Sequence, residues 1–402
     1  MRTTPRGWAL VLIAFLLYFF ANQTQVGWLY VLCALIVGVW LGARFLPQRM
    51  LRGLSLTRRI NNIRLPTELE LHANQPLTIE LEIKNVSRLP ALQIRGGEVC
   101  PLAPTAERDQ SFFITNARAR GSVTVRYETV CARRGWFEFP PVPLTTRAPF
   151  GFYSATRTVE SRTGVLVFPE YRELKRFPLF DRVPAQENPF PQIGLAGEFI
   201  GVRDYRPGDS RRQVHWRSTA RAGRLIVKEF AEETQPGLTI ALDLRSSSVM
   251  GTDPHTSLEL AIKIAATLAR YADKLALPVH LVVNSRRWPA PPGPVSWWGM
   301  LNYLARVEAD APADDSFADC LRGSRPTSFL AALLTAPDVS AIDPLIEARR
   351  AGLGVLAILI DPASFDGPSH SLSNVQAALL AGGVPTRMIG AEPEWERTLG
   401  KV

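Results

Sequence analysis

Two apolar stretches without a single charged residue follow each other closely at the start of this sequence. Residues 7–21 read GWALVLIAFLLYFFA, and residues 26–43 read VGWLYVLCALIVGVWLGA. An α-helix needs about 17–25 mainly apolar residues to cross the hydrocarbon core of a bilayer. The second stretch meets this length, and the first meets it if the polar residues after it enter the headgroup region. We therefore expect a transmembrane hairpin in residues 1–50, with helices at about 7–22 and 26–43.

Arginines flank this hairpin on both sides, while its connecting turn carries no charge. Arg2 and Arg6 precede it, and Arg44 and Arg49 follow it. Because basic residues are retained on the cytoplasmic side, we expect a multi-pass protein of the inner membrane with its soluble domains in the cytoplasm. A signal peptide is the competing interpretation. The second apolar stretch and the lack of a small-x-small cleavage site argue against it. A buried pair of soluble helices is the remaining alternative.

Residues 55–170 have the pattern of a β domain. Residues 77–83 alternate apolar and polar side chains with a period of two, which is typical of a half-buried strand. Further strands are expected at 68–71, 91–95, 122–130, 136–144, 151–159 and 164–168. The prolines in 135–144 favour an edge strand there. Short strands at this spacing predict a small β-sandwich.

The pattern changes again in the second half of the chain. Residues 171–236 contain a proline-dotted linker and a highly charged segment. Residues 237–392 then alternate strands and helices, with strands expected at 238–243, 278–284, 329–335 and 355–361 and an amphipathic helix at 257–274. Such alternation predicts an α/β domain whose parallel sheet is covered on both faces.

The charged segment is the most distinctive part of the sequence. Residues 205–209 are typical of a turn, since Pro207 fixes φ and Gly208 accepts a positive φ. Arg212, Trp216 and Ala220 follow at four-residue spacing, as on one face of a helix. Residues 197–233 hold eight basic and six acidic residues, which favours a salt-bridged surface element. The alternative is an anion-binding or partner-docking surface built from Arg203, Arg206, Arg211, Arg212 and Arg217.

This segment resembles the hallmark of domain-of-unknown-function family 58, which has the pattern E-F-x-x-x-R-x-Y-x-x-G-D-x-x-R-x-I-x-W-x-x-[ST]-A-R. The matching positions are Glu198, Phe199, Arg203, Tyr205, Gly208, Asp209, Arg212, Val214, Trp216, Thr219, Ala220 and Arg221, and only Val214 departs from the pattern. Upstream, residues 146–152 resemble a second element of that family, with Ala148 where aspartate is common. The resemblance implies two membrane helices, a β domain, the hallmark and a doubly wound, von Willebrand A-like domain.

A von Willebrand A domain binds Mg²⁺ through D-x-S-x-S after its first strand, together with Thr and Asp from later loops. Here the first strand ends at Asp243, followed by Leu244, Arg245, Ser246 and Ser247. Arg245 replaces the first serine, cannot ligate a cation and is expected to pair with Asp243 in its place. Asp243, Ser247 and Asp338, with Thr335, form a degenerate metal site, and a shift of register to Ser246 and Ser248 is the alternative. We therefore expect no cofactor, with Mg²⁺ as the alternative.

The remaining features point to no enzyme class. The four cysteines form no C-x-x-C pair, the five histidines have no zinc-site spacing, and no phosphate loop, G-x-S-x-G elbow or H-E-x-x-H motif is present. His215, beside Trp216, is expected to be a packing or hydrogen-bonding residue, and a general base is the alternative, together with Asp209 and nearby arginines. The formal charge of +9 comes from 40 Arg and 6 Lys without a basic block.

The resemblance implies a function in interaction rather than catalysis. Members of the family are commonly encoded beside MoxR-type AAA+ ATPases, so we expect a membrane-anchored cytoplasmic adaptor that assists such an ATPase in the assembly or maturation of other proteins. Its interaction residues would be Glu198, Arg203, Tyr205, Gly208, Asp209, Arg212, Trp216 and Arg221. The alternatives are an enzyme that uses residues 203–221, or an arginine-driven binder of anionic lipid or nucleic acid. The sequence specifies neither client nor oligomeric state.

Overall fold

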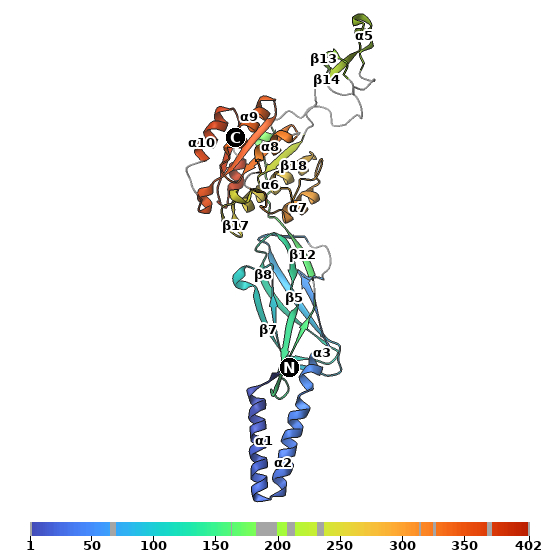
Figure 1. Ribbon diagram of the computed structural model, residues 1–402, viewed down its shortest axis with the longest axis vertical. Coiled ribbons are helices and arrows are strands. Elements are labelled where there is room, and N and C mark those ends of the chain that lie inside the picture. The colour runs from blue at the N-terminus through green and yellow to red at the C-terminus, as the bar shows by residue number, and fades with distance from the viewer. Residues whose placement is uncertain are drawn as a thin grey trace. The chain divides into compact units, whose positions relative to one another are not determined.

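The computed structural model (Figure 1) divides into two compact units, Met1–Glu170 and Tyr171–Val402. It describes residues 2–64, 70–161, 163–181, 199–206, 214–230, 237–312, 315–324, 327–367 and 372–400. The expected strand at 68–71 lies largely outside these residues, as do Glu198, Gly208, Asp209 and Arg212. Each unit is described by itself below.

The first unit begins with the two expected helices, α1 (Pro5–Thr24) and α2 (Gly27–Ala43). Thr4 caps α1 by accepting a hydrogen bond from the Gly7 amide, and Pro5 suits the first helical position. Gln25 turns the chain in the left-handed region, with φ 56°. Both helices are long and apolar enough to cross a membrane. Most of their large apolar side chains are exposed, as expected for a lipid-facing surface rather than a soluble core.

The helix ends are joined to the β domain at three places. Strand β1 (Arg2–Thr3) pairs with β11 (Tyr153–Val159) in an antiparallel ladder. The Thr4 hydroxyl donates to the Gly151 carbonyl at 2.5 Å. The short helix α3 (Leu46–Arg52) follows α2, and Arg157 of β11 donates to the carbonyls of Leu51 and Leu54 near its end. The α1–α2 helix pair and the β domain are therefore connected by backbone and side-chain hydrogen bonds.

The β domain consists of three sheets around one core. The strand orders are β1-β11-β10-β6-β7, β3-β2-β5-β8 and β4-β12-β9. The remaining strands are β2 (Leu54–Ile60), β3 (Ile63–Arg64), β4 (Leu71–His72), β5 (Pro76–Asn85), β6 (Ala91–Val99), β7 (Asp109–Ala117), β8 (Ser122–Val130), β9 (Gly135–Phe139), β10 (Val142–Thr146) and β12 (Thr163–Phe168). Alternate residues of β5, such as Ile79 and Leu81, are fully buried, which is the period-two pattern expected for this segment.

Two strand predictions in this domain need correction. Residues 136–144 do not form one edge strand, because Pro140 and Pro141 separate β9 from β10 and the two strands belong to different sheets. Strand β9 is an edge strand, whereas β10 lies between β11 and β6. The second correction concerns missed strands. Strands β2 and β7 were not predicted, although the residues of β2 alternate in burial throughout and those of β7 over part of their length.

One buried ion pair lies inside the β domain. Arg58 is 1% exposed and Glu98 is also 1% exposed, and Arg58 Nε donates to Glu98 Oε1 at 2.7 Å. Tyr127 donates to Glu98 Oε2 at 2.6 Å, and the Arg58 guanidinium lies 4.0 Å from the centre of the Phe139 ring. A buried charge is tolerated when it is paired and hydrogen-bonded, and both members of this pair are.

The second unit is built on a five-stranded sheet in which all neighbouring strands are parallel. Its order is β18-β15-β19-β20-β21. The strands are β15 (Leu238–Leu242), β18 (Val279–Val283), β19 (Phe329–Leu334), β20 (Gly354–Ile360) and β21 (Thr386–Ile389); the helices are α6 (Ser257–Lys274), α7 (Trp297–Arg306), α8 (Phe317–Gly323), α9 (Ile342–Arg350), α10 (Leu372–Ala381) and α11 (Trp395–Leu399). The expected strands and the amphipathic helix at 257–274 are thus present.

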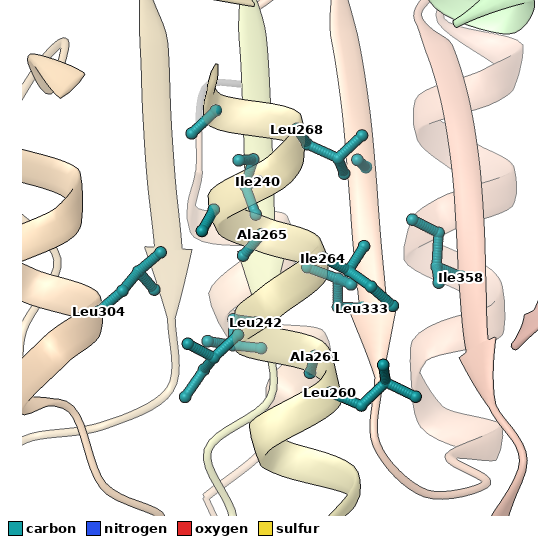
Figure 2. Close-up of a cluster of buried hydrophobic side chains, with 14 of the residues drawn as sticks. Ile240, Leu242, Leu260, Ala261, Ile264, Ala265, Leu268, Leu304, Leu333 and Ile358 are labelled. Atoms are coloured by element: carbon teal, nitrogen blue, oxygen red, sulfur yellow. The ribbon is translucent and has the colours of Figure 1, made fainter. Parts of the chain in front are cut away.

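Each face of this sheet has its own core. On one face, α6 places Ala261, Ala265 and Leu268 over Ile240, Leu242, Leu333 and Ile358 (Figure 2). On the other face, Ala332 and Leu359 pack with residues of α8, α9 and α10. Every residue of β15, β19 and β20 is buried, which explains why these strands have continuous apolar runs rather than alternation.

The chain before and after the expected α/β domain also belongs to its core. Residues 171–181 were expected in a linker, but Phe177 is fully buried and Phe180 is 6% exposed. Phe177 stacks on Phe180, and both rings meet Phe329 edge-on. Helix α11 lies beyond the predicted boundary at 392 and buries Trp395 and Leu399 in the same cluster. The fold therefore extends past both predicted edges.

Candidate functional site

The described part of the charged segment forms a small module of its own, which we call the hairpin module (residues 199–206 and 214–230). Strands β13 (Phe199–Asp204) and β14 (Ile226–Phe230) form a two-stranded antiparallel sheet. Helix α5 (Trp216–Ala222) lies between them in sequence. The Tyr205 amide donates to the Leu225 carbonyl at 3.0 Å, and the His215 amide donates to the Ile226 carbonyl at 2.8 Å.

Helix α5 is defined by its two ends. His215 is its N-cap, and its Nδ1 accepts a hydrogen bond from the Ser218 amide at 3.2 Å. Gly223 ends the helix in the left-handed region, with φ 66°. Thr219 accepts from the Ile226 amide at 3.1 Å and so ties the helix to β14. His215 thus caps α5 through a side-chain hydrogen bond.

The hairpin module carries large apolar side chains on its surface. Trp216 is 68% exposed, and Leu225 and Val202 are 46% and 44% exposed. Val214 and Val227 are buried and form the small apolar interior. Trp216, at the first residue of α5, leaves about two thirds of its surface exposed, and tryptophan is enriched at protein–protein hot spots.

Basic side chains accompany this apolar surface. The described residues of the hairpin module include six basic and two acidic side chains, within a segment, residues 197–233, whose net charge is +2. Arg217, Arg221 and Arg224 are exposed, and Arg224 pairs with Asp204 at 3.1 Å. Arg203 is half-buried and donates to the Asp204 carbonyl, and Tyr205 is half-buried beside it in sequence. Of the predicted interaction residues, the structure thus places Arg203, Tyr205, Trp216 and Arg221 on one module.

A second polar cluster lies in the α/β unit at the carboxyl end of the sheet. The Arg245 side chain donates to Asp243 from Nε and from Nη2, at 3.0 and 2.8 Å. The same Nη2 donates to Asp338 Oδ2 at 2.6 Å. Asp243 follows β15 and Asp338 follows β19, so one guanidinium joins the ends of two neighbouring strands.

The strand order shows why the carboxyl ends of β15 and β19 are a candidate binding position. From β15 the chain continues to β18 on one side, while β19 lies on the other side, so the order of the sheet reverses between β15 and β19. In open α/β sheets, ligands bind outside the carboxyl ends of the strands at such a reversal. Arg245, 15% exposed, occupies this position.

The cluster does not fit a divalent cation. The guanidinium lies between the two carboxylates that would be the ligands, and its positive charge repels a metal. The hydrogen bonds with Asp243 are the largest cause that raises the pKa of Arg245, and the group stays charged. The expected pairing of Arg245 with Asp243 is present, and the contact with Asp338 adds to it.

Neighbouring hydroxyl and amide groups complete the cluster. Ser247 is exposed in a short 3₁₀ turn, whereas Ser248 is buried and lies 2.7 Å from the Thr335 hydroxyl. Asn284 donates to Asp243 Oδ1 at 2.8 Å and accepts from the Leu244 amide. Asn284 was not predicted, although its position after β18, at the same edge of the sheet, is the signal that identifies it.

Comparisons with known proteins relate the chain to proteins without a described function. A family model described as "Protein of unknown function DUF58" matches residues 201–325. "Uncharacterized protein YeaD" of Bacillus subtilis (strain 168) is 25% identical over 203 residues, which is 47% of this chain and 47% of that protein. The chain thus spans about half the length of this curated relative.

Similarities to solved structures are weak. The PilB minor pilin from Streptococcus sanguinis has a TM-score of 0.26 and 9% identity, over 76% of this chain and 84% of that chain. A point mutant of that pilin has a TM-score of 0.28 and 9% identity, over 77% and 85%. These scores carry no argument about fold or function. The chain is therefore similar, over residues 201–325, to a protein family of unknown function.

Proposed function

We propose that this protein is a membrane-anchored adaptor that uses its hairpin module to dock a protein partner in the cytoplasm. The observation that carries the proposal is Trp216, which is 68% exposed at the start of α5, with the exposed arginines Arg217 and Arg221 on the same helix. An aromatic anchor surrounded by basic residues suits a partner surface with an apolar pocket and acidic neighbours. The proposal assigns the function to recognition rather than to a chemical reaction.

The anchor in this proposal is the α1–α2 hairpin. The arginines at its two ends support an orientation with both ends in the cytoplasm, because residues 1–52 contain five arginines and no acidic residue. The soluble units then lie on the cytoplasmic side of the inner membrane. The β domain, proposed to be a sandwich, is hydrogen-bonded to the helix ends and would stay close to the membrane surface.

The proposed partner is an AAA+ ATPase of the MoxR type. This choice rests on the resemblance to domain-of-unknown-function family 58, whose members are commonly encoded beside such ATPases. The charge of the segment adds a requirement. Residues 197–233 have eight basic and six acidic side chains, a net charge of +2, and a basic surface associates faster with an acidic one, more so at low salt. The ATPase surface that meets Trp216 should therefore be acidic, and the complex should assist assembly or maturation of other proteins.

The α/β unit is proposed to be a doubly wound, von Willebrand A-like domain without a metal. Its strand order, with β15 flanked by β18 and β19, and Asp243 at the end of the first strand support this assignment. In that case Arg245 supplies permanently the positive charge that Mg²⁺ supplies in related domains. The unit would then present its carboxyl edge independently of divalent cations.

Binding of the purified, detergent-solubilised protein to a purified MoxR-type AAA+ ATPase from the same organism tests the proposal. Trp216→Ala should weaken binding about 30-fold, because loss of a hot-spot tryptophan costs about 2 kcal/mol. Trp136→Ala is the matched control, since Trp136 is 55% exposed but lies on β9 of the other unit. Unchanged binding by folded Trp216→Ala, or equal loss in both variants, would contradict the proposal.

A further inference from the structure

An apolar groove runs between the two N-terminal helices. It has a volume of about 310 Å³ and is lined from both helices by Leu10, Ala14, Tyr18, Cys33, Val37 and Trp40, among others. This volume is at the lower end of the range of ligand pockets, which is about 300–1,000 Å³. The lining contains only apolar and aromatic side chains and one cysteine, so the groove suits a hydrocarbon chain.

Two hydrogen-bond donors without acceptors lie at one end of this groove. The indole N–H of Trp40, which lines the groove, has no hydrogen-bond partner among the described residues. The same is true of the Tyr153 hydroxyl, although Tyr153 is only 4% exposed. The two rings are neighbours, with centroids 5.6 Å apart. Leaving a buried donor unpaired costs about 1–3 kcal/mol, so two together require an explanation.

Two arginines adjoin the same end. Arg44 lies one turn after Trp40, and its charge opposes the effect of burial, which raises the pKa of Tyr153. Arg6 lies beside Gly151, where a Cβ would be 3.6 Å from Arg6 Nη1. Both arginines are exposed, and residues 1–52 contain no acidic side chain to neutralise them. Two exposed arginines therefore adjoin the two unpaired donors.

We infer that the groove, Trp40, Tyr153, Arg6 and Arg44 form a binding site for one anionic glycerophospholipid of the surrounding membrane. The inference rests on the membrane anchoring in the proposed function. One acyl chain would occupy the groove, ester and phosphate oxygens would accept from Trp40 and Tyr153, and the phosphate would pair with the arginines. A transmembrane helix of another protein is the weaker occupant, because its backbone carbonyls are already hydrogen-bonded within the helix and it supplies no negative charge.

Lipid binding to the full-length protein, measured by native mass spectrometry in mild detergent, tests this site. The probes are phosphatidylglycerol and the zwitterionic phosphatidylethanolamine. The wild type should bind phosphatidylglycerol more tightly. Arg6→Gln/Arg44→Gln should weaken that binding about 30-fold, from about 1 kcal/mol for each arginine. Trp40→Phe/Tyr153→Phe, which keeps both rings, should weaken binding of both lipids.

A matched control separates local contacts from net charge. Arg118→Gln/Arg126→Gln removes two exposed arginines from the β domain and should leave phosphatidylglycerol binding unchanged. Equal binding of the two lipids by the wild type, or equal loss in both arginine variants, would overturn the inference. Alkaline carbonate extraction separates the two proposals. An integral protein without lipid preference overturns the lipid site alone, whereas a protein released by carbonate overturns the membrane anchor as well.

Discussion

Replacing Arg245 by methionine should destabilise the α/β unit by about 3–5 kcal/mol, the cost of breaking a buried ion pair from one side. Oδ2 of Asp243 and Oδ2 of Asp338 would both lose the guanidinium donor. Oδ1 of Asp243 would keep Asn284, and Oδ1 of Asp338 would keep the Ser340 hydroxyl at 2.6 Å. Two acceptors that each lose a donor at about 1–3 kcal/mol give about 2–6 kcal/mol, a range that includes this value.

Thermal unfolding of the full-length protein in detergent, with hydrogen exchange to follow β15 and β19, measures this effect. For a unit of this size, the expected loss corresponds to a Tm lower by about 6–20 °C. Arg286→Met is the control, because Arg286 pairs with Asp315 at 2.9 Å but its side chain is 85% exposed. An exposed pair contributes about 0–1 kcal/mol, so the Tm should hardly change.

A second substitution shows whether the unpaired charge is the cause. Asp243→Asn/Arg245→Met removes one of the two carboxylate charges and should be more stable than Arg245→Met alone. Two results would contradict this account of the guanidinium. One is that Arg245→Met unfolds at the wild-type temperature. The other is that the double variant is less stable than Arg245→Met, as if the two substitutions acted independently.

Three further predictions concern the cores. Phe177→Ala should cost about 3–5 kcal/mol in urea unfolding of the α/β unit, and a loss below about 1 kcal/mol would show that residues 171–181 are a linker after all. Arg58→Met should destabilise the β domain by about 3–5 kcal/mol, because it leaves the buried Glu98 carboxyl without its guanidinium partner; an unchanged urea midpoint would contradict this. Burial raises the pKa of the Cys131 thiol from 9.0 to about 12, so its contribution to stability is present below pH 9 and is lost as pH rises towards 12. By about pH 10.5 the loss is about 2 kcal/mol, and Cys131→Ala should remove that part of the pH dependence.

The sequence predicted those elements whose pattern is set by local physics. The uncharged runs at 7–21 and 26–43 could only be long apolar helices, and the 3.6-residue pattern of 257–274 matches α6. Strands β15 and β20 were visible because each is buried on both faces and therefore entirely apolar. Strand β7 has no such run, and five of its nine residues are exposed polar or aromatic side chains.

The remaining features depend on contacts between distant residues. Arg58 has the appearance of one more arginine near the membrane helices, and only its burial beside Glu98, forty positions away, reveals an internal ion pair. Phe177 reads as part of a proline-dotted linker until α6 and β19 bring Tyr271 and Phe329 against it.

In the polar cluster of the α/β unit, the pairing of Asp243 with Arg245 was predicted from the sequence. Asp243 and Arg245 are two residues apart, so their pairing was foreseeable, whereas the contribution of Asn284 needed the strand order of the sheet. In the hairpin module, the four-residue spacing placed Trp216 and Ala220 on one helix, but α5 begins only at Trp216.

Site-specific photo-crosslinking in cells tests the central proposal most directly. A photoreactive phenylalanine analogue would replace Trp216 in one variant and Trp136 in the other, since both side chains are more than half exposed. Docking through the hairpin module predicts a crosslink from position 216 to an AAA+ ATPase and none from position 136. A membrane-inserted protein that gives no ATPase crosslink from position 216, or gives it equally from both positions, would contradict the account.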